Sequence, residues 1–397
     1  MKYISMLALG LLALSLPATI YADAPASPYA KWTHGPSTDP SYFPLAVWLQ
    51  SSRHAADYAK AGINTYVAFS DDLNDQTLAA LKNAGIKLIY GQDAASLKYV
   101  NDPTIIGWMH GDEPDNAQDL PDKSGYGPPI LPQKIVDEYT AMVKADSTRP
   151  VMLNLGLSVA YNEWGGRGTR TGHAEDYPEY FKGADLVSFD IYPVAGGPHE
   201  VEGKLWYVPK GVDHLVSISH GEKVVWNCLE CTHISEPTKL ATPQQVRAEA
   251  WMSIIHGSMG LIYFVHQFKP TFIEAGLLAE PEMLAAVTAL NKQITSLAPV
   301  LNSPTLANGA QLQVEAEKQS EPNPAPVDIM VKHHQGSTYI FAAEMRDAPA
   351  KATLTVPTLK LGSTVTVLDE NRTIDVKDGS FTDTFAPWDV HIYQIKD

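Results

Sequence analysis

The sequence predicts a (β/α)8 barrel followed by a small β-sandwich, and three observations support this prediction. Between residues 45 and 300, short apolar runs of strand type alternate with segments of helical periodicity. This region has about the length of a typical (β/α)8 barrel, roughly 250 residues. After residue 300 only strand patterns follow. We therefore assign residues 25–300 to the barrel and 301–397 to the sandwich.

The expected barrel strands are short and apolar. They cover residues 45–49, 65–69, 86–90, 105–109, 151–153, 184–191, 224–226 and 260–265. Helices are expected at 51–61, 74–85, 94–100, 135–143 and 284–297, and another starts at Thr242, where Thr242 and Gln245 match a capping box. A doubly wound open sheet is the alternative, but its Gly-x-Gly-x-x-Gly turn is missing after the first strand.

The last 95 or so residues alternate apolar and polar positions. Pro304 and a proline cluster at 322–326 interrupt the chain, and strands are expected at 339–342, 353–356, 364–368 and 390–393. Turn residues separate these runs, and no helical pattern lies between them. This texture is typical of a small β-sandwich.

The first 24 residues match a secretory signal peptide. Lys2 precedes an apolar run at 4–16, Pro17 breaks that run, and Ala22 and Ala24 offer small residues for cleavage. No other stretch is long and apolar enough to cross a bilayer. We therefore expect a mature protein that is secreted or periplasmic and has no membrane anchor.

The charge balance is strongly acidic. The chain has 45 Asp and Glu against 29 Lys and Arg, a net charge of −16. Nucleic acids and anionic membrane surfaces require a cationic face, so neither is an expected partner. No motif indicates a cofactor, the histidines lack zinc-protease spacing, and no metal site is expected. The sequence does not indicate an oligomeric state.

Two glutamates follow strands of the expected barrel. Glu113 ends the fourth strand, where Pro114 stops the ladder, and Glu230 ends the seventh. The carboxyl ends of all barrel strands surround one mouth, where catalytic residues of this fold lie. Two carboxylates facing each other there suit glycoside hydrolysis, and a separation of about 5 Å would indicate retention of configuration. The alternative for either residue is a polar turn after a strand.

These positions resemble those of clan A glycoside hydrolases, a superfamily of retaining enzymes on this barrel. The clan carries its acid/base glutamate in Asn-Glu-Pro after strand four and its nucleophile glutamate after strand seven. Asp112-Glu113-Pro114 and the segment from Trp226 to Glu230 match these places. The resemblance implies that Glu113 is the acid/base and Glu230 the nucleophile, and that Tyr192 after strand six lies near the nucleophile.

Two departures from the clan keep alternatives open. Asp112 replaces the asparagine that binds the sugar 2-hydroxyl, and His266 stands where strand eight usually offers tryptophan. An Asp-Glu pair also resembles hexosaminidases in which the substrate acetamido group is the nucleophile. A non-catalytic glycan-binding barrel is a further alternative, because fold alone does not determine function.

Further residues are candidates for contact with a carbohydrate substrate. Asp112 and Asp190 can accept sugar hydroxyls, and flat aromatic rings can stack on sugar rings, although core packing is the alternative for each ring. The candidate contacts are Trp48, Trp164, Trp226, Tyr192, His266, Asp112 and Asp190. Arg167 and Arg170, in the long loop after strand five, could meet an acidic sugar or lie in solvent.

The chain has two cysteines, Cys228 and Cys231, on either side of Leu229 and Glu230. A thioredoxin-like context and a second pair of zinc ligands are both missing. The pair is therefore expected to form a local disulfide or to consist of two inert thiols.

Overall fold

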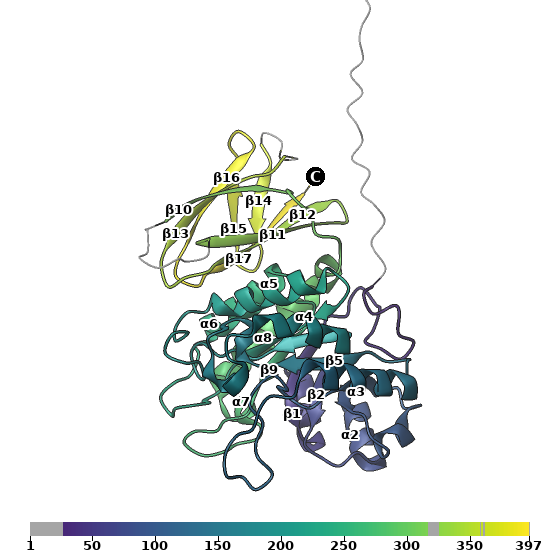
Figure 1. The fold of residues 1–397 in the computed structure, drawn as a ribbon. Coiled ribbons are helices and arrows are strands. Elements are labelled where there is room, and N and C mark those ends of the chain that lie inside the picture. Colours follow the sequence, from purple (N-terminus) through teal and green to yellow (C-terminus); the bar gives the residue numbers. More distant parts are fainter. Residues whose placement is uncertain (1–26, 317–324, 358, 360–361, 397) are drawn as a thin grey trace, which may run out of the picture.

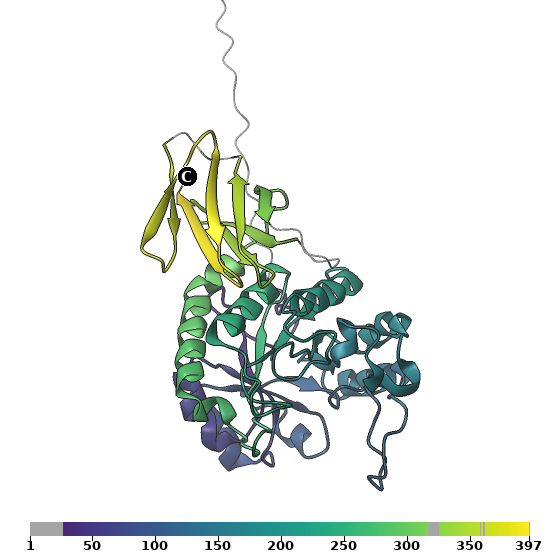
Figure 2. The same ribbon diagram turned by 90° about the vertical axis from the view of Figure 1, so that its left-hand side faces the viewer.

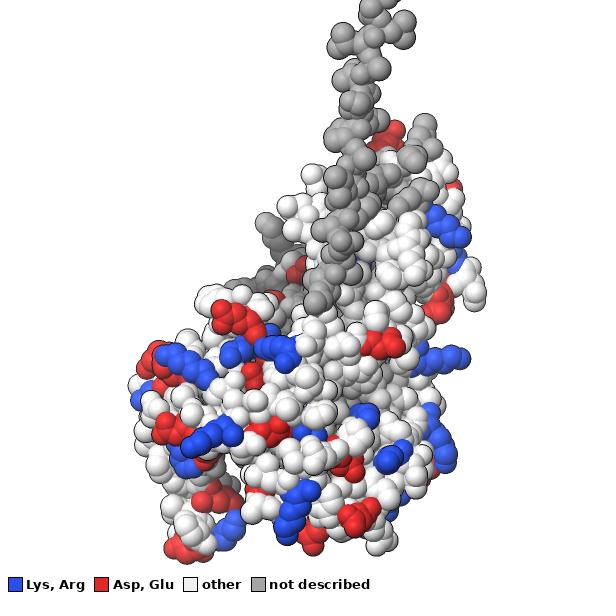
Figure 3. All heavy atoms as spheres, turned by 90° about the vertical axis from the view of Figure 1, so that its right-hand side faces the viewer, with Lys and Arg blue, Asp and Glu red and all other residues white. Residues whose placement is uncertain are grey.

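The computed structural model describes residues 27–316, 325–357, 359 and 362–396 (Figure 1). The expected signal peptide lies outside the described residues. Among the described residues, no helix is both long enough and apolar enough to span a membrane. On the face shown in Figure 3, acidic and basic side chains are interspersed.

A closed parallel sheet forms the centre of the larger part of the chain. Its strands are β1 (Leu45–Gln50), β2 (Thr65–Phe69), β3 (Lys87–Gly91), β4 (Ile105–Met109), β5 (Val151–Leu155), β6 (Leu186–Phe189), β7 (Val224–Val225), β8 (Asn227–Glu230) and β9 (Leu261–Phe264). The order is β7-β6-β5-β4-β3-β2-β1-β9-β8. Only Trp226 separates β7 from β8, so these two segments act as one strand that pairs with β6 and then with β9. The barrel prediction is confirmed.

Helices surround the sheet (Figures 1 and 2). They are α1 (Ala55–Lys60), α2 (Asp75–Ala84), α3 (Pro132–Ala145), α4 (Tyr177–Tyr180), α5 (Tyr207–Ser219), α6 (Pro243–Ile255), α7 (Gly276–Ala279) and α8 (Pro281–Leu301). The predicted capping box at the start of α6 is present, with reciprocal bonds between Thr242 and Gln245. The helix expected at 94–100 is a short 3-10 turn, Ser96–Tyr99.

Further 3-10 turns connect these elements. They are Ser52–His54, Leu157–Val159, Gly165–Arg170, Ala174–Asp176 and Phe181–Gly183.

The barrel has an inner and an outer apolar layer, as the two faces of its strands require. The inner layer includes Trp48, Ile89, Met109, Trp226 and Ile262. The outer layer lies between strands and helices and is larger. Alternate residues of one strand therefore face different layers, which decides where each strand-end side chain points.

The C-terminal part is a two-sheet sandwich, as predicted. The sheets have the orders β10-β13-β16 and β11-β12-β17-β14-β15. The strands are β10 (Gln311–Ala316), β11 (Val327–His334), β12 (Ser337–Glu344), β13 (Ala350–Thr355), β14 (Thr364–Val367), β15 (Arg372–Asp375), β16 (Ser380–Phe385) and β17 (Val390–Lys396). A separate apolar cluster fills the space between the sheets.

The sandwich packs against helix α6. Trp251 stacks on Phe341 with ring centroids 5.4 Å apart. The Arg247 guanidinium donates to the Val390 carbonyl at 3.0 Å, and the Gln244 side chain donates to the Pro387 carbonyl at 2.9 Å. The contact therefore combines an aromatic stack with polar bonds at its edge.

Candidate active site

Glu113 lies directly after β4 in a strained turn. Its backbone φ is 41°, a left-handed value that costs a non-glycine residue roughly 1–2 kcal/mol. The turn is held by Asp115, which is buried and accepts from the Gly156 amide at 2.8 Å and the Tyr177 hydroxyl at 3.0 Å. Asn116 donates to the Glu113 carboxylate at 2.9 Å. A strained residue fixed in this way is typical of functional sites.

Asn154 on β5 joins two carboxylates of the mouth. Its Nδ2 donates to Asp112 at 2.9 Å and to Asp190 at 3.2 Å. The Ser188 hydroxyl donates to Asn154 Oδ1 at 2.6 Å and so fixes the amide orientation. Asn154 was not predicted from the sequence, although a polar residue inside the apolar run 151–155 is a usable signal.

Burial and mutual repulsion shift the pKa values of this carboxylate cluster, which consists of Asp112, Glu113 and Asp190. Burial, followed by the charges of Asp190, Asp112 and Asp115, raises the pKa of Glu113 to about 9. Burial and Asp190 raise the pKa of Asp112 to about 7. Burial raises the pKa of Asp190 only to about 6, because hydrogen bonds from Cys228, Asn154 and Tyr192 oppose it. Glu113 therefore holds its proton most strongly.

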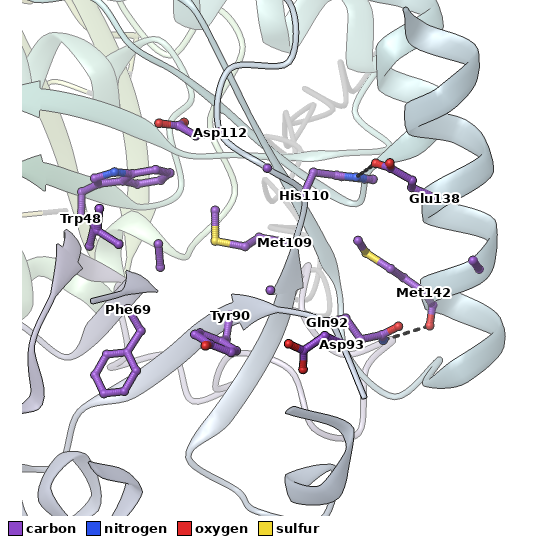
Figure 4. Close-up of a pocket in the computed structure, with 15 residues that line it drawn as sticks. Trp48, Phe69, Tyr90, Gln92, Asp93, Met109, His110, Asp112, Glu138 and Met142 are labelled. Atoms are coloured by element: carbon purple, nitrogen blue, oxygen red, sulfur yellow. Dashed lines mark hydrogen bonds and ion pairs between the residues drawn. The ribbon is translucent and has the colours of Figure 1, made fainter. Parts of the chain in front are cut away.

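A pocket of about 750 Å³ opens beside the cluster (Figure 4). Asp112 is exposed to this space although protein surrounds its other sides, and Trp48 and Met109 border the pocket near it. His110 and Glu138 lie on the opposite side of the pocket, with His110 Nδ1 3.4 Å from Glu138 Oε2. No Lys or Arg is among the described residues that line it. The pocket is thus acidic and partly aromatic.

Glu230 has a different environment. Its side chain is fully buried, the Val194 amide donates to Oε1 at 2.7 Å, and the Ala195 amide donates to Oε2. Burial raises its pKa to about 7 despite these two bonds and the neighbouring Glu249 of α6. The structure therefore brings Asp112, Glu113 and Asp190 together and seals Glu230 beneath the segment that follows Tyr192.

Glu249 is the carboxyl partner of Glu230. It is also fully buried, and no hydrogen-bond donor from the described part of the chain reaches either of its oxygens. Burial and the charge of Glu230 raise its pKa well above the ordinary value. Glu249 is therefore protonated when Glu230 is ionised. This pair was not predicted from the sequence, because the helical pattern of α6 does not show that Glu249 points towards the last residue of β8.

Tyr192 lies beside the carboxylate cluster. Its hydroxyl is buried, and burial with the charges of Asp190, Cys228, Glu113 and Asp112 raises its pKa well above normal. Tyr192 stays neutral in this field and contributes a hydrogen bond that lowers the pKa of Asp190. It thus belongs to the cluster of Glu113, and the prediction that it lies near a nucleophile is untested.

The predicted aromatic contacts have different locations. Trp48 lines the pocket, and Trp164 is half-buried in the loop after β5. Trp226 is fully buried, donates to the Tyr29 hydroxyl at 3.0 Å and belongs to the barrel core, which corrects its assignment as a substrate contact. His266 borders a second cavity, and its Nε2–H donates to the Leu49 carbonyl at 2.9 Å.

Two further predictions are corrected by the side-chain positions. Arg167 is buried and paired with Asp176 at 2.7 Å, and Arg170 also binds Asp176, so neither is free for an acidic sugar. Cys228 and Cys231 are free thiols in the structure, so no disulfide joins them there, and their inertness stays a prediction. Burial raises the pKa of both thiols.

No family model matches the chain, and no curated protein matches its sequence. Solved structures do match its fold. The α-amylase of Geobacillus thermoleovorans, crystallised with acarbose, gives a TM-score of 0.54 at 8% identity over 90% of this chain and 99% of that chain. A variant of AmyP bound to maltotriose gives 0.52 at 9% identity over 90% and 97%. At such identity the likeness shows the fold.

Proposed function

We propose that the protein is a glycoside hydrolase of the clan A superfamily that acts on a poly- or oligosaccharide, with Glu113 as general acid. One observation carries this proposal: Glu113 stays protonated at neutral pH beside an open acidic pocket at the barrel mouth. A glycosidase needs a carboxylic acid that keeps its proton until the leaving oxygen takes it. The amylase and AmyP structures carry sugar ligands in a similar fold, which agrees with this class of substrate.

In the proposed reaction Glu113 protonates the leaving glycosidic oxygen. The neighbouring carboxylates Asp112 and Asp190 raise its pKa and so keep the proton available. Once the proton has left, Glu113 is a base that can activate water for the second step of a retaining mechanism. Asn154 holds Asp112 and Asp190 in fixed positions during these steps.

Glu230 is the proposed nucleophile. Two backbone amides hold its carboxylate, which keeps it oriented and lowers its pKa against the effect of burial. Because Val194 and Ala195 cover it, the proposal requires this segment to move when sugar binds. The proposed reaction then has two chemical steps through a glycosyl ester of Glu230.

A substrate-assisted reaction is the second candidate, and one observation favours it. Asp112 is exposed to the pocket beside Glu113, whereas Glu230 is fully buried. In such a reaction Asp112 orients the 2-acetamido group of the sugar, and the acetamido oxygen attacks the anomeric carbon. No glycosyl ester of the protein forms, and only 2-acetamido sugars are cleaved.

Turnover of aryl glycosides and a polysaccharide panel tests the proposed function. We expect wild type to cleave at least one substrate. In Glu113→Gln we expect kcat to fall about 10²- to 10⁴-fold, because an amide cannot donate the proton. Glu282→Gln changes an exposed glutamate of α8 and is the matched control. A wild-type protein that binds glycans without cleaving any would establish the non-catalytic alternative.

Labelling of the nucleophile separates the two candidate reactions. A 2-deoxy-2-fluoro glycoside of the accepted sugar should form an ester with Glu230, found by mass spectrometry of peptides. Glu230→Gln should abolish the ester. Cleavage restricted to 2-acetamido sugars, without any ester, would instead support the route through Asp112.

Export of the protein is also proposed. Sequencing the N-terminus of the secreted chain tests whether residues 1–24 have been removed.

A further inference from the structure

A hairpin after β9 presents two phenylalanines to solvent. The backbones of Gln267 and Ile273 bond to each other in both directions, at 3.0 and 2.9 Å, so residues 268–272 form the tip. Phe268 is 43% exposed and Phe272 61% exposed, and their ring centroids lie 5.7 Å apart with planes inclined by 33°. We call this pair the phenylalanine platform.

The hairpin is fastened at several points and is therefore a defined surface. The Phe268 amide donates to the His233 carbonyl at 2.9 Å. At its other end Glu274 accepts from the Ser51 amide at 2.8 Å and the Ser70 hydroxyl at 2.5 Å, and binds Arg53. A Cβ on Gly276 would lie 2.8 Å from the Val265 carbonyl and the Gln267 amide, so only glycine fits this closure.

The platform borders a second cavity at the mouth of the barrel. This cavity, of about 510 Å³, is lined by Phe272 and His266 and by polar groups of Ser51, Arg53, Ser70, Asp71 and Glu274. Leu49 lines both this cavity and the pocket beside Asp112, so the two spaces adjoin. An aromatic face next to carboxylates and hydroxyls matches a sugar ring, which has apolar C–H faces and polar edges.

We propose that the phenylalanine platform and the adjoining cavity bind a neighbouring sugar ring of the same carbohydrate chain whose scissile residue occupies the pocket beside Asp112. This inference rests on the proposed function and adds a second sugar-binding subsite beside the pocket of Asp112. Apolar side chains that are exposed next to one another form a contiguous patch, and such patches mark binding sites. The ring of the neighbouring sugar covers Phe272, and its hydroxyls reach Asp71 and the serines.

Binding measurements separate this inference from the proposed function. Glu113→Gln is titrated with the oligosaccharide series of the cleaved polymer, with and without Phe272→Ala, and binding is followed by calorimetry. We expect Phe272→Ala to weaken binding of long oligosaccharides about tenfold, the size of one aromatic contact of about 1.4 kcal/mol, and to leave the monosaccharide unaffected. Met259→Ala, which truncates a side chain 44% exposed at the amino end of β9, is the control.

Each outcome decides one proposal. If Phe272→Ala and Met259→Ala, each made in Glu113→Gln, bind long oligosaccharides with equal affinity, the platform does not bind sugar. This conclusion holds even when wild type binds and cleaves the polymer. Equal weakening of monosaccharide and oligosaccharide also overturns the proposed role of the platform, because the effect then lies in the pocket of Asp112. Absence of all glycan binding in every variant contradicts the proposed function itself. Phe268→Ala, combined with unchanged melting temperatures, checks that the platform and not a folding defect is responsible.

Discussion

Two groups of acidic side chains keep their carboxyl groups close together by different means. One is the carboxylate cluster of Asp112, Glu113 and Asp190, and the other is the buried pair of Glu230 and Glu249. The cluster is open to the pocket, and an amide donor from Asn154 bridges two of its members. The pair is closed to solvent, its Glu249 keeps a proton because burial raises the pKa, and two backbone amides hold Glu230. Solvent and a bridging donor keep two carboxylates of the cluster able to ionise, whereas the pair keeps a proton at neutral pH.

Removing the bridge should have the largest effect. Asn154→Leu leaves Asp112 and Asp190 without a common donor, so we expect kcat/KM to fall about 100-fold, since hydrogen bonds to charged groups contribute about 1.5–3 kcal/mol each. Asn227→Leu is the matched change near the buried pair, where Asn227 donates to Ser253 at 2.8 Å. It should lower the melting temperature and leave kcat/KM nearly unchanged. An equal loss of kcat/KM in Asn154→Leu and Asn227→Leu would show that the open cluster matters no more for activity than the surroundings of the buried pair.

The pH profile of kcat/KM should report the open cluster. Glu113 must be protonated, and its pKa is raised to about 9. Activity should therefore fall about tenfold for each pH unit above pH 9. Asp190→Asn removes the largest neighbouring charge and should move this limb to lower pH. A limb that stays in place would show that another group supplies the proton.

The dependence of stability on pH should report the buried pair. Burial raises the pKa of both carboxyl groups in the folded state above the ordinary value of 4.5. The free energy of unfolding is therefore highest below pH 4.5 and falls as the pH rises; the contribution of Glu230 to this fall ends at about pH 7. Glu249→Gln removes one titrating group, so its advantage over wild type should grow by about 1.4 kcal/mol per pH unit in that window. Denaturant unfolding at several pH values measures this difference, with Glu282→Gln as control. Parallel curves would show that the folded state does not raise the pKa of Glu249.

The smallest effect is expected at the thiols. Cys228 faces the open cluster and Cys231 lies in the outer layer, yet both are buried. A thiol reagent should modify neither in the folded protein and both after unfolding without reductant. Two thiols that appear only after reduction would indicate a disulfide instead.

The barrel was predictable because its signals are local. Each strand and helix carries its own periodicity, and the box of Thr242 and Gln245 fixed the start of α6. Helix α5 escaped this reading because it contains Pro209 and Gly211, both poor helix formers. Gly211 is required there, since a Cβ would come within 2.1 Å of the Phe189 ring.

The site was only partly predictable because it depends on contacts between distant segments. Strand ends located Asp112, Glu113 and Asp190 correctly near one mouth. The burial of Glu230 depends on the segment of Val194 and Ala195 folding over it and on Glu249 from α6. Trp226 is similar, because the partner that keeps it in the core is Tyr29, almost 200 residues earlier. Strand periodicity contains no information about such partners.

The contact between the sandwich and α6 limits how this architecture can evolve. One face of α6 carries Glu249 towards the barrel, and the residues around Trp251 meet Phe341 of the sandwich. Exchange of the C-terminal domain by recombination near residue 301 would uncover the helix that closes the core around Glu230. Homologous chains should therefore inherit both parts together, and substitutions at Trp251 and Phe341 should co-vary.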